Sequence, residues 1–202
     1  MRVFVDMDGV LANLNKAIAP AFGLEYPREG IVGYSWLMDK ANVSAPQFFN
    51  IMESNSGLWE TAPPFPWTSK LIQILDLKFP DWMILTSATH DAACWHGKVE
   101  WVRRYLTETG VKKLVMIGGN KERIASRGDL LIDDWFVNVT AWREQGGIAY
   151  HWLDYSEGML DPGYKQLEDL SQFLDEHLGV VSIARNKWKQ TVDGRALNPN
   201  VY

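Results

Sequence analysis

The sequence places two aspartates, Asp6 and Asp8, one residue apart and directly after the apolar run Val3-Phe4-Val5. Such a run is typical of a buried strand, and the aspartates fall where that strand ends. Side chains alternate along a strand, so both carboxylates would point to the same side, and Gly9 would let the backbone turn behind them. Like charges this close repel, and a bound cation is the simplest remedy. A solvated turn is the alternative, because aspartate and glycine are ordinary turn residues.

A second acidic pair, Asp133-Asp134, follows another strand-like run, Leu130-Leu131-Ile132. In an open parallel sheet, ligands bind beyond the carboxyl ends of the strands. Two strands that end in acids could therefore gather three or four carboxylates around one point. Hard oxygen ligands of this kind suit Mg²⁺, which keeps its remaining positions for water and phosphate. The second pair thus favours a metal site over a solvated turn.

Two further strand-like runs end in residues suited to phosphate. Residues 82–85 precede Thr86-Ser87, and small hydroxyls with backbone N–H groups at a strand end can hold phosphate oxygens. A helix cap is the alternative role for these two residues. Residues 114–117 precede Lys121, which offers a cation, and Lys98 is its rival for that role. A phosphate site beside the predicted metal follows from this placement.

In this order, the segments resemble the four motifs of the haloacid dehalogenase-like (HAD) phosphatase superfamily: residues 6–12, Thr86-Ser87, Lys121 and residues 131–134. The closer resemblance is to the 5′(3′)-deoxyribonucleotidase family. That family has a similar opening motif, a Thr-Ser after the second core strand, and a Gly-Asp-Leu-Leu-Ile-Asp-Asp segment like residues 128–134. The likeness covers residues 1–14 and 82–150 and is weak over residues 15–66.

The resemblance implies a phosphoaspartyl mechanism. Asp6 would attack phosphorus as the nucleophile, and Asp8 would act first as general acid and then as general base. The implied cofactor is Mg²⁺, held by Asp6, Asp8 and the last motif. There the resemblance favours Asp134 as the direct ligand with Asp133 as support, although the sequence itself does not order the two.

The same resemblance implies that Thr86, Ser87 and Lys121 bind the phosphate. The implied activity is that of a Mg²⁺-dependent phosphomonoesterase acting on (deoxy)nucleoside monophosphates, a 5′-nucleotidase or deoxyribonucleotidase. A HAD phosphatase for another small ester, such as a sugar phosphate, is one alternative. A non-catalytic nucleotide-binding module is another, although the complete set of acids and lysine argues against it.

A nucleoside presents a flat base, so an aromatic-lined pocket is its expected host. Residues 15–66 are rich in aromatics, and we expect Tyr34, Trp36 and Trp59 to lie nearest the base. Two residues depart from the family. Asn13 stands where the family usually has Asp, and Leu14 stands where it has an aromatic residue.

The strand-like and helical segments alternate, which predicts an α/β fold of the HAD-like (Rossmann-type) kind, with a parallel sheet and helices on both faces. The predicted strands are residues 2–5, 82–86, 113–117, 129–133 and 147–151. The predicted helices are residues 46–54, 68–79, 94–108, 121–126, 136–145 and 164–177. We expect a core of residues 1–14 and 67–180, a small helical cap of residues 15–66 inserted after the first strand, and a C-terminal tail of residues 181–202.

The composition limits the kinds of partner that we expect this protein to bind. The 202 residues carry a net charge of −5 with no long basic run, so a nucleic-acid polymer is not expected. No apolar run reaches membrane length and no signal peptide pattern is seen, and the single cysteine fits a reducing compartment. We therefore expect a cytoplasmic enzyme whose partner is a small nucleotide or other phosphate ester. The tail is compatible with packing on the core, with a homodimer, or with partial disorder.

Overall fold

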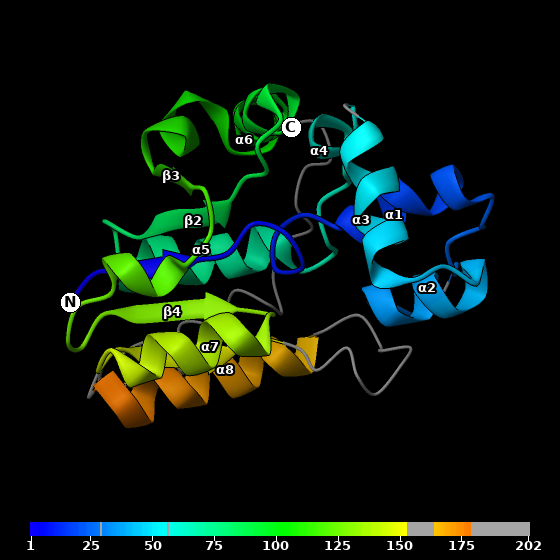
Figure 1. Ribbon diagram of the computed structural model, residues 1–202. Coiled ribbons are helices and arrows are strands. Elements are labelled where there is room, and N and C mark those ends of the chain that lie inside the picture. The colour runs from blue at the N-terminus through cyan, green and yellow to red at the C-terminus, as the bar shows by residue number, and fades with distance from the viewer. Residues whose placement is uncertain (29, 56, 153–163, 179–202) are drawn as a thin grey trace. The chain divides into compact units, whose positions relative to one another are not determined.

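The computed structural model describes residues 1–28, 30–55, 57–152 and 164–178 (Figure 1). Its centre is a five-stranded parallel sheet with strand order β3-β2-β1-β4-β5. The strands are β1 (Val3–Val5), β2 (Met83–Ser87), β3 (Leu114–Ile117), β4 (Leu130–Asp133) and β5 (Ile148–His151). Each overlaps a run predicted from the sequence. All of β1 is buried, as expected of a central parallel strand with neighbours on both edges and helices on its faces.

The register of the sheet brings the acidic motifs together. Val5 of β1 pairs with Ile132 of β4, so the residues that follow them, Asp6 and Asp133, come level at the carboxyl edge. On the other side Val5 pairs with Ile84 of β2, and Thr86 lies two residues later in that strand, which ends at Ser87. The edge predicted to hold the ligand is therefore built from three adjacent strands.

Helices cover both faces of this sheet, and α5 and α7 lie on opposite sides of it in Figure 1. The helices after the cap are α5 (Thr68–Lys78), α6 (Ala92–Lys112), the 3-10 helix η2 (Lys121–Ile124) and α7 (Phe136–Glu144). Trp142 of α7 packs edge-on against Phe4 of β1, with ring centroids 5.4 Å apart. Burying a large apolar side chain of this kind contributes roughly 1.5–3 kcal/mol. This packing fixes α7, and with it the chain that leaves Asp133.

The segment between β1 and α5 is helical, as predicted. It contains α1 (Leu14–Ile18), the 3-10 helix η1 (Ala19–Phe22), α2 (Tyr34–Ala41), α3 (Ala45–Ser54) and α4 (Leu58–Thr61). Helix α3 begins at a capping box in which Ser44 and Gln47 satisfy each other's backbone groups. Its Phe48 stacks on Phe22 with centroids 4.9 Å apart, so aromatic packing supplies the core of this small cap.

Two helices differ from their predictions. Helix α6 begins earlier than predicted, because the Asp91 side chain accepts a hydrogen bond from the Ala93 N–H at 2.9 Å and caps it. Near its end the backbone breaks at Thr107, whose φ is +63°. The predicted helix at 121–126 is the four-residue η2, which ends where Ala125 turns to an extended conformation.

The chain divides into two compact units, Met1–Tyr164 and Lys165–Tyr202. The described part of the second unit lies in α8 (Tyr164–Leu178), whose Leu167, Leu170 and Leu174 recur at helical spacing on one face. The predicted tail, 181–202, lies outside the described residues, and the predicted core and cap boundaries stay predictions. Within the described ranges, no helix combines the length and the apolar character that crossing a membrane requires.

Candidate active site

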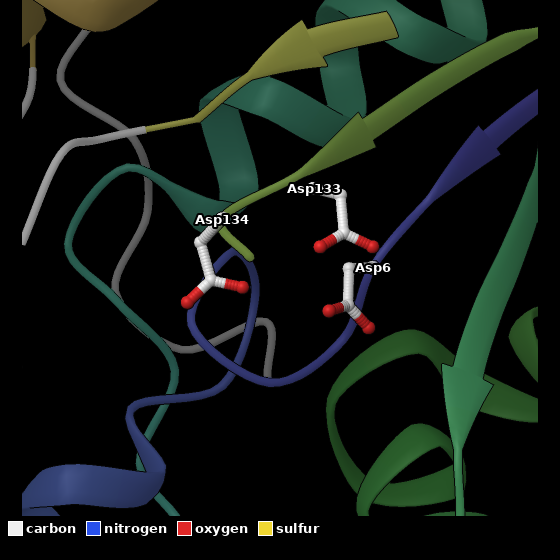
Figure 2. Close-up of side chains that lie close together, drawn as sticks. All are labelled: Asp6, Asp133 and Asp134. Atoms are coloured by element: carbon white, nitrogen blue, oxygen red, sulfur yellow. The ribbon is translucent and has the colours of Figure 1, made fainter. Parts of the chain in front are cut away.

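Three carboxylates meet at the carboxyl edge of the sheet. Asp6, Asp133 and Asp134 each offer an oxygen, and these oxygens all lie within 4.8 Å of one another. Figure 2 shows the three side chains turned into the same space between the end of β1 and the end of β4. The two segments are more than 120 residues apart in the sequence, and the pairing of β1 with β4 brings them together.

Lys121 neutralises part of this charge. Its Nζ lies 2.7 Å from Asp6 Oδ1 and 2.7 Å from Asp133 Oδ2, and its side chain is buried. Burial alone would lower the pKa of Lys121, but the two carboxylates more than offset it and the pKa is raised. Burial raises the pKa of Asp6 to about 7, where Lys121 opposes the rise and Asp133 and Asp8 add to it. Asp6 is therefore poised to change charge near neutral pH.

The two acids of the last motif have different surroundings. Asp133 is fully buried and accepts hydrogen bonds from the Trp135 N–H at 2.8 Å and from Asn138 Nδ2 at 3.2 Å, besides its contact with Lys121. For the Asp134 carboxylate, no hydrogen bond is found among the described residues. Burial raises the pKa of Asp134 well above its usual value, and Asp6 and Asp133 raise it further. Asp134 is thus the carboxylate left for an outside ligand.

Gly9 makes room for that carboxylate. A side chain at this position would place its Cβ 1.9 Å from Asp134 Oδ2, and the backbone φ of +79° also favours glycine. The loop folds back on itself through hydrogen bonds from the Leu11 and Ala12 N–H groups to the Met7 carbonyl, each 2.8 Å long. The glycine after the two aspartates therefore lets the opening motif lie directly against the closing one.

The same loop is fastened to the chain that returns from the cap. Trp67 Nε1 donates to the Val10 carbonyl at 2.8 Å, and the Thr68 hydroxyl donates to the Leu11 carbonyl at 2.7 Å. All of these groups are buried, so the bonds are protected from water. They hold the loop that carries Asp8 in one conformation.

A second buried lysine, Lys98, contacts Asp8. Lys98 Nζ forms an ion pair with Asp8 Oδ2 and donates to Thr86 Oγ1 at 2.7 Å. Asp8 Oδ1 is buried and has no hydrogen-bond partner among the described residues. Ser87 follows Thr86 at the same strand end and is half-buried. Lys98, treated in the sequence as a rival of Lys121, thus contacts Asp8 and Thr86, whereas Lys121 contacts Asp6 and Asp133. The assignment of Thr86, Ser87 and Lys121 to phosphate binding stays a prediction.

Lys98 reaches the site because of tight helix packing. The neighbouring Gly97 faces α4, where an added Cβ would come within 3.0 Å of Trp59 Cβ and 3.1 Å of the Glu60 nitrogen. Lys98 lies in the buried stripe of α6 with Cys94 and Trp101, at helical spacing. A lysine in an otherwise apolar stripe is the sequence signal that could have identified it.

The three aromatic residues predicted for the base pocket lie in different surroundings. Tyr34 is half-buried at the start of α2, and burial raises the pKa of its hydroxyl well above the usual value, with Asp8, Asp134 and Asp6 adding to the rise. Its hydroxyl thus lies within the field of the acids. Trp36 is half-exposed with Lys40 Nζ 6.0 Å from its ring, while Trp59 is buried against Gly97. The assignment of all three to a base pocket stays a prediction.

These acids and lysines form a set that we call the ionic floor: Asp6, Asp8, Lys98, Lys121, Asp133 and Asp134. Against this geometry, the family model described as "5' nucleotidase, deoxy (Pyrimidine), cytosolic type C protein" matches residues 1–156. The chain belongs to this 5′ nucleotidase family. Members of such a family hydrolyse phosphoric monoesters, and the chain is a hydrolase of this type.

Solved structures agree on the fold. A hydrolase from Streptococcus pneumoniae TIGR4 superposes with a TM-score of 0.51 at 14% identity, covering 86% of this chain and 97% of that one. The HAD-hydrolase YfnB from Bacillus subtilis, solved bound to magnesium, gives a TM-score of 0.50 at 12% identity, covering 86% and 98%. No curated protein matches the sequence significantly. The HAD-like fold predicted for this 5′ nucleotidase family member is confirmed.

Proposed function

We propose that this protein is a Mg²⁺-dependent phosphatase of (deoxy)nucleoside monophosphates that works through a phosphoaspartyl intermediate on Asp6. The observation that carries the proposal is the ionic floor itself, in which four carboxylates face two buried ammonium groups at the carboxyl edge of the sheet. The membership of a 5′ nucleotidase family supports the choice of a nucleoside monophosphate as substrate.

The residues at this edge fit Mg²⁺. The carboxylates outnumber the lysines by two, which leaves an excess of negative charge in a buried place. The available donors are oxygens, as Mg²⁺ prefers, and Asp134 has a carboxylate with no hydrogen-bond donor among the described residues. Asp6, Asp134 and the backbone carbonyl of Asp8 would hold the ion, with Asp133 fixing Lys121. Once bound, Mg²⁺ would offset the negative charge of the phosphoryl oxygens.

The chain's own groups would carry the two chemical steps. An Asp6 oxygen attacks phosphorus, the bond to the ester oxygen breaks, and Asp8 gives that leaving oxygen a proton. Asp8 then takes a proton from a water molecule, which attacks phosphorus and frees Asp6 and phosphate. Asp8 Oδ1, buried and without a partner among the described residues, is the oxygen available for these transfers.

Four groups would hold the phosphoryl oxygens. The lysine ammonium groups of Lys98 and Lys121 supply charge, and the Thr86 hydroxyl and the Ser87 N–H supply directed hydrogen bonds. Because both lysines are already fixed by carboxylates, little reorganisation is needed when the phosphate arrives. The family's cytosolic description supports a cytoplasmic location and a small-molecule partner.

The test is phosphate release from a panel of esters with and without Mg²⁺. The panel contains the deoxyribonucleoside and ribonucleoside monophosphates and several sugar phosphates, and it also includes acetyl phosphate, an acyl phosphate rather than an ester. We expect the fastest turnover on a nucleoside monophosphate and loss of turnover when the metal is chelated. Faster turnover of a sugar phosphate than of every nucleotide would assign the site to a different small ester. Absence of release from every ester would leave a non-catalytic binding module.

A further inference from the structure

An exposed apolar segment lies directly beside the acids. Trp135, Phe136 and Val137 follow Asp134 in the chain, and 45%, 64% and 62% of their surfaces are exposed. Among the described residues, only two other large hydrophobic residues are noted as exposed, Met1 and Leu77. Consecutive exposed apolar residues at one place mark a binding surface more often than scattered ones do. We call these three residues the apolar wall.

The apolar wall lines a cleft that leads to the ionic floor. The cleft has a volume of about 380 Å³, and Gly9 and Asp134 lie on the same lining as the wall. Gly33, Tyr34 and Ser35 contribute from the start of α2. A volume of this size falls within the range of about 300–1,000 Å³ that is typical of small-molecule sites. The cleft is therefore continuous with the acids and large enough for a nucleoside.

The backbone at the start of the wall is held by contacts with Asp133 and His151. The Trp135 N–H donates to Asp133 Oδ1 at 2.8 Å, which fixes the start of α7. His151 at the end of β5 contacts the Asp134 carbonyl through Nε2 at 3.0 Å, and its ring meets that of Phe136 with centroids 6.1 Å apart. Because the backbone here is already ordered, a ligand that covers the wall has only side chains to immobilise.

Tyr34 adds a further aromatic side chain to the lining of the cleft. The Tyr34 ring packs edge-on against Phe48, with centroids 5.4 Å apart, and against Phe49 at 6.4 Å. Tyr34 and Asp134 line the same cleft, and burial raises the pKa of the Tyr34 hydroxyl, with the charges of Asp8, Asp134 and Asp6 adding to the rise. The lining of the cleft therefore runs from Asp134 to an aromatic side chain that packs on the cap.

We propose that this cleft receives the leaving group of the phosphate ester and that the apolar wall, with Tyr34, selects leaving groups that carry a planar ring system. The inference rests on the proposed function, since it assigns the part of the site that lies beyond the phosphate. A base that stacks on one aromatic side chain gains roughly 5- to 150-fold in affinity. A purely aliphatic sugar phosphate has no flat face to place there, so the wall favours nucleotides over such esters.

The experiment measures selectivity as the ratio of kcat/KM for a deoxyribonucleoside monophosphate to that for acetyl phosphate, which has no ring. In Trp135→Ala and in Phe136→Ala we expect this ratio to fall about 10-fold, mainly through a higher KM for the nucleotide. Trp135→Phe keeps a ring and is expected to recover most of the ratio. Leu77→Ala is the matched control, because Leu77 is 67% exposed but lies on α5 and does not line this cleft, and its ratio stays unchanged.

An unchanged ratio in both alanine variants, or an equal recovery with Trp135→Leu and Trp135→Phe, would overturn the proposal. A fall of the ratio in Trp36→Ala with no fall in the wall variants would also overturn it.

If the wild type hydrolyses acetyl phosphate but no nucleotide, the proposed function fails. The ratio of kcat/KM for 4-nitrophenyl phosphate to that for acetyl phosphate then tests whether the wall selects a planar ring. If it hydrolyses nothing, calorimetric binding of a deoxyribonucleoside to the wild type and to Trp135→Ala decides instead. Equal affinity would contradict the inference.

Discussion

The ionic floor and the apolar wall meet at Asp134 but are built in opposite ways. In the floor, buried Lys121 contacts Asp6 and Asp133 at 2.7 Å and Lys98 forms an ion pair with Asp8, so both lysines have acidic partners before any ligand arrives. In the wall, side chains are exposed and only their backbone and one ring contact fix them. The comparison suggests a division of labour in which the floor performs the reaction on phosphate and the wall chooses what is attached to it.

The largest expected effect is the loss of turnover when a residue of the ionic floor is replaced, which should far exceed the effect of replacing a residue of the apolar wall. Asp6→Asn removes the nucleophile, and we expect kcat to fall by at least about 10⁴-fold, as for other covalent catalysts. A wall variant changes selectivity by only about 10-fold. The measurement is phosphate release with Mg²⁺. Turnover within 10-fold of the wild type in Asp6→Asn would refute the nucleophile assignment.

A second prediction for Asp6→Asn concerns how the stability of the protein depends on pH. The pKa of Asp6 rises from its ordinary value of 3.8 to about 7 in the folded protein. Because folding raises this pKa, the protonation of Asp6 adds to the free energy of unfolding. This contribution is fully present below about pH 4 and is lost as the pH rises toward 7. Asparagine does not titrate, so metal-free Asp6→Asn should lose less stability than the wild type when the pH is raised from 4 to 8, even though it also loses an ionic partner of Lys121. An equal loss over that pH range in both proteins would contradict the pKa assignment.

The two acids of the last motif offer a sharper comparison inside the floor. Asp134→Asn should weaken Mg²⁺ binding by about 100-fold or more, with little change in thermal stability, because its carboxylate has no protein donor to lose among the described residues. Asp133→Asn should cost on the order of 3 kcal/mol, because it removes a buried partner of Lys121. Calorimetric Mg²⁺ titration and chemical denaturation measure the two effects. The reverse pattern would make Asp133 the direct ligand.

The two lysines are expected to differ as well. Lys98→Met should lower kcat/KM by about 10²-fold, since Asp8 loses the cation that positions it, but Asp8 is partly exposed and water can replace the contact. Lys121→Met leaves two buried carboxylates without their cation and should cost about 3–5 kcal/mol. Kinetics and denaturation of both variants test this. Equal losses of stability would remove the distinction.

The smallest expected effect is the release of protons when Mg²⁺ binds. At pH 6 the carboxyl of Asp6, with a pKa of about 7, is mostly protonated, and the raised pKa of Asp134 acts in the same direction. Metal ligands must be deprotonated, so Mg²⁺ binding should release about one proton at pH 6 and fewer at pH 8, and affinity should rise with pH. Titration calorimetry in buffers of different ionisation enthalpy measures the release. No release at pH 6 would show that these acids are already ionised.

Much of the floor could be predicted from the sequence because strand ends carry it. Apolar runs reveal strands, parallel strands share a carboxyl edge, and Asp6 and Asp133 follow such runs. The sequence favours Lys121 over Lys98 because Lys121 follows a strand-like run and precedes the last motif, whereas Lys98 lies on a helix, where packing decides which face is buried. The structure shows that Gly97 against Trp59 makes that decision.

The wall could not be predicted in the same way. An apolar run at the start of α7 has the pattern of residues that pack into a core, and Val139 and Trp142 further along that helix do so. Trp135 and Phe136 are exposed because Asp133 and His151 hold the start of the helix at the cleft, which is a tertiary effect. Trp59 is the converse case, an aromatic residue predicted near the base that lies buried between helices.

The most direct test is to trap the covalent intermediate. The protein is mixed with Mg²⁺ and a deoxyribonucleoside monophosphate carrying labelled phosphate, quenched in acid within the first turnovers, and digested for mass spectrometry. The account predicts a labelled peptide that contains Asp6, whose label hydroxylamine releases and which Asp6→Asn does not form. Steady product formation with no labelled protein, or with the label on another residue, would contradict it.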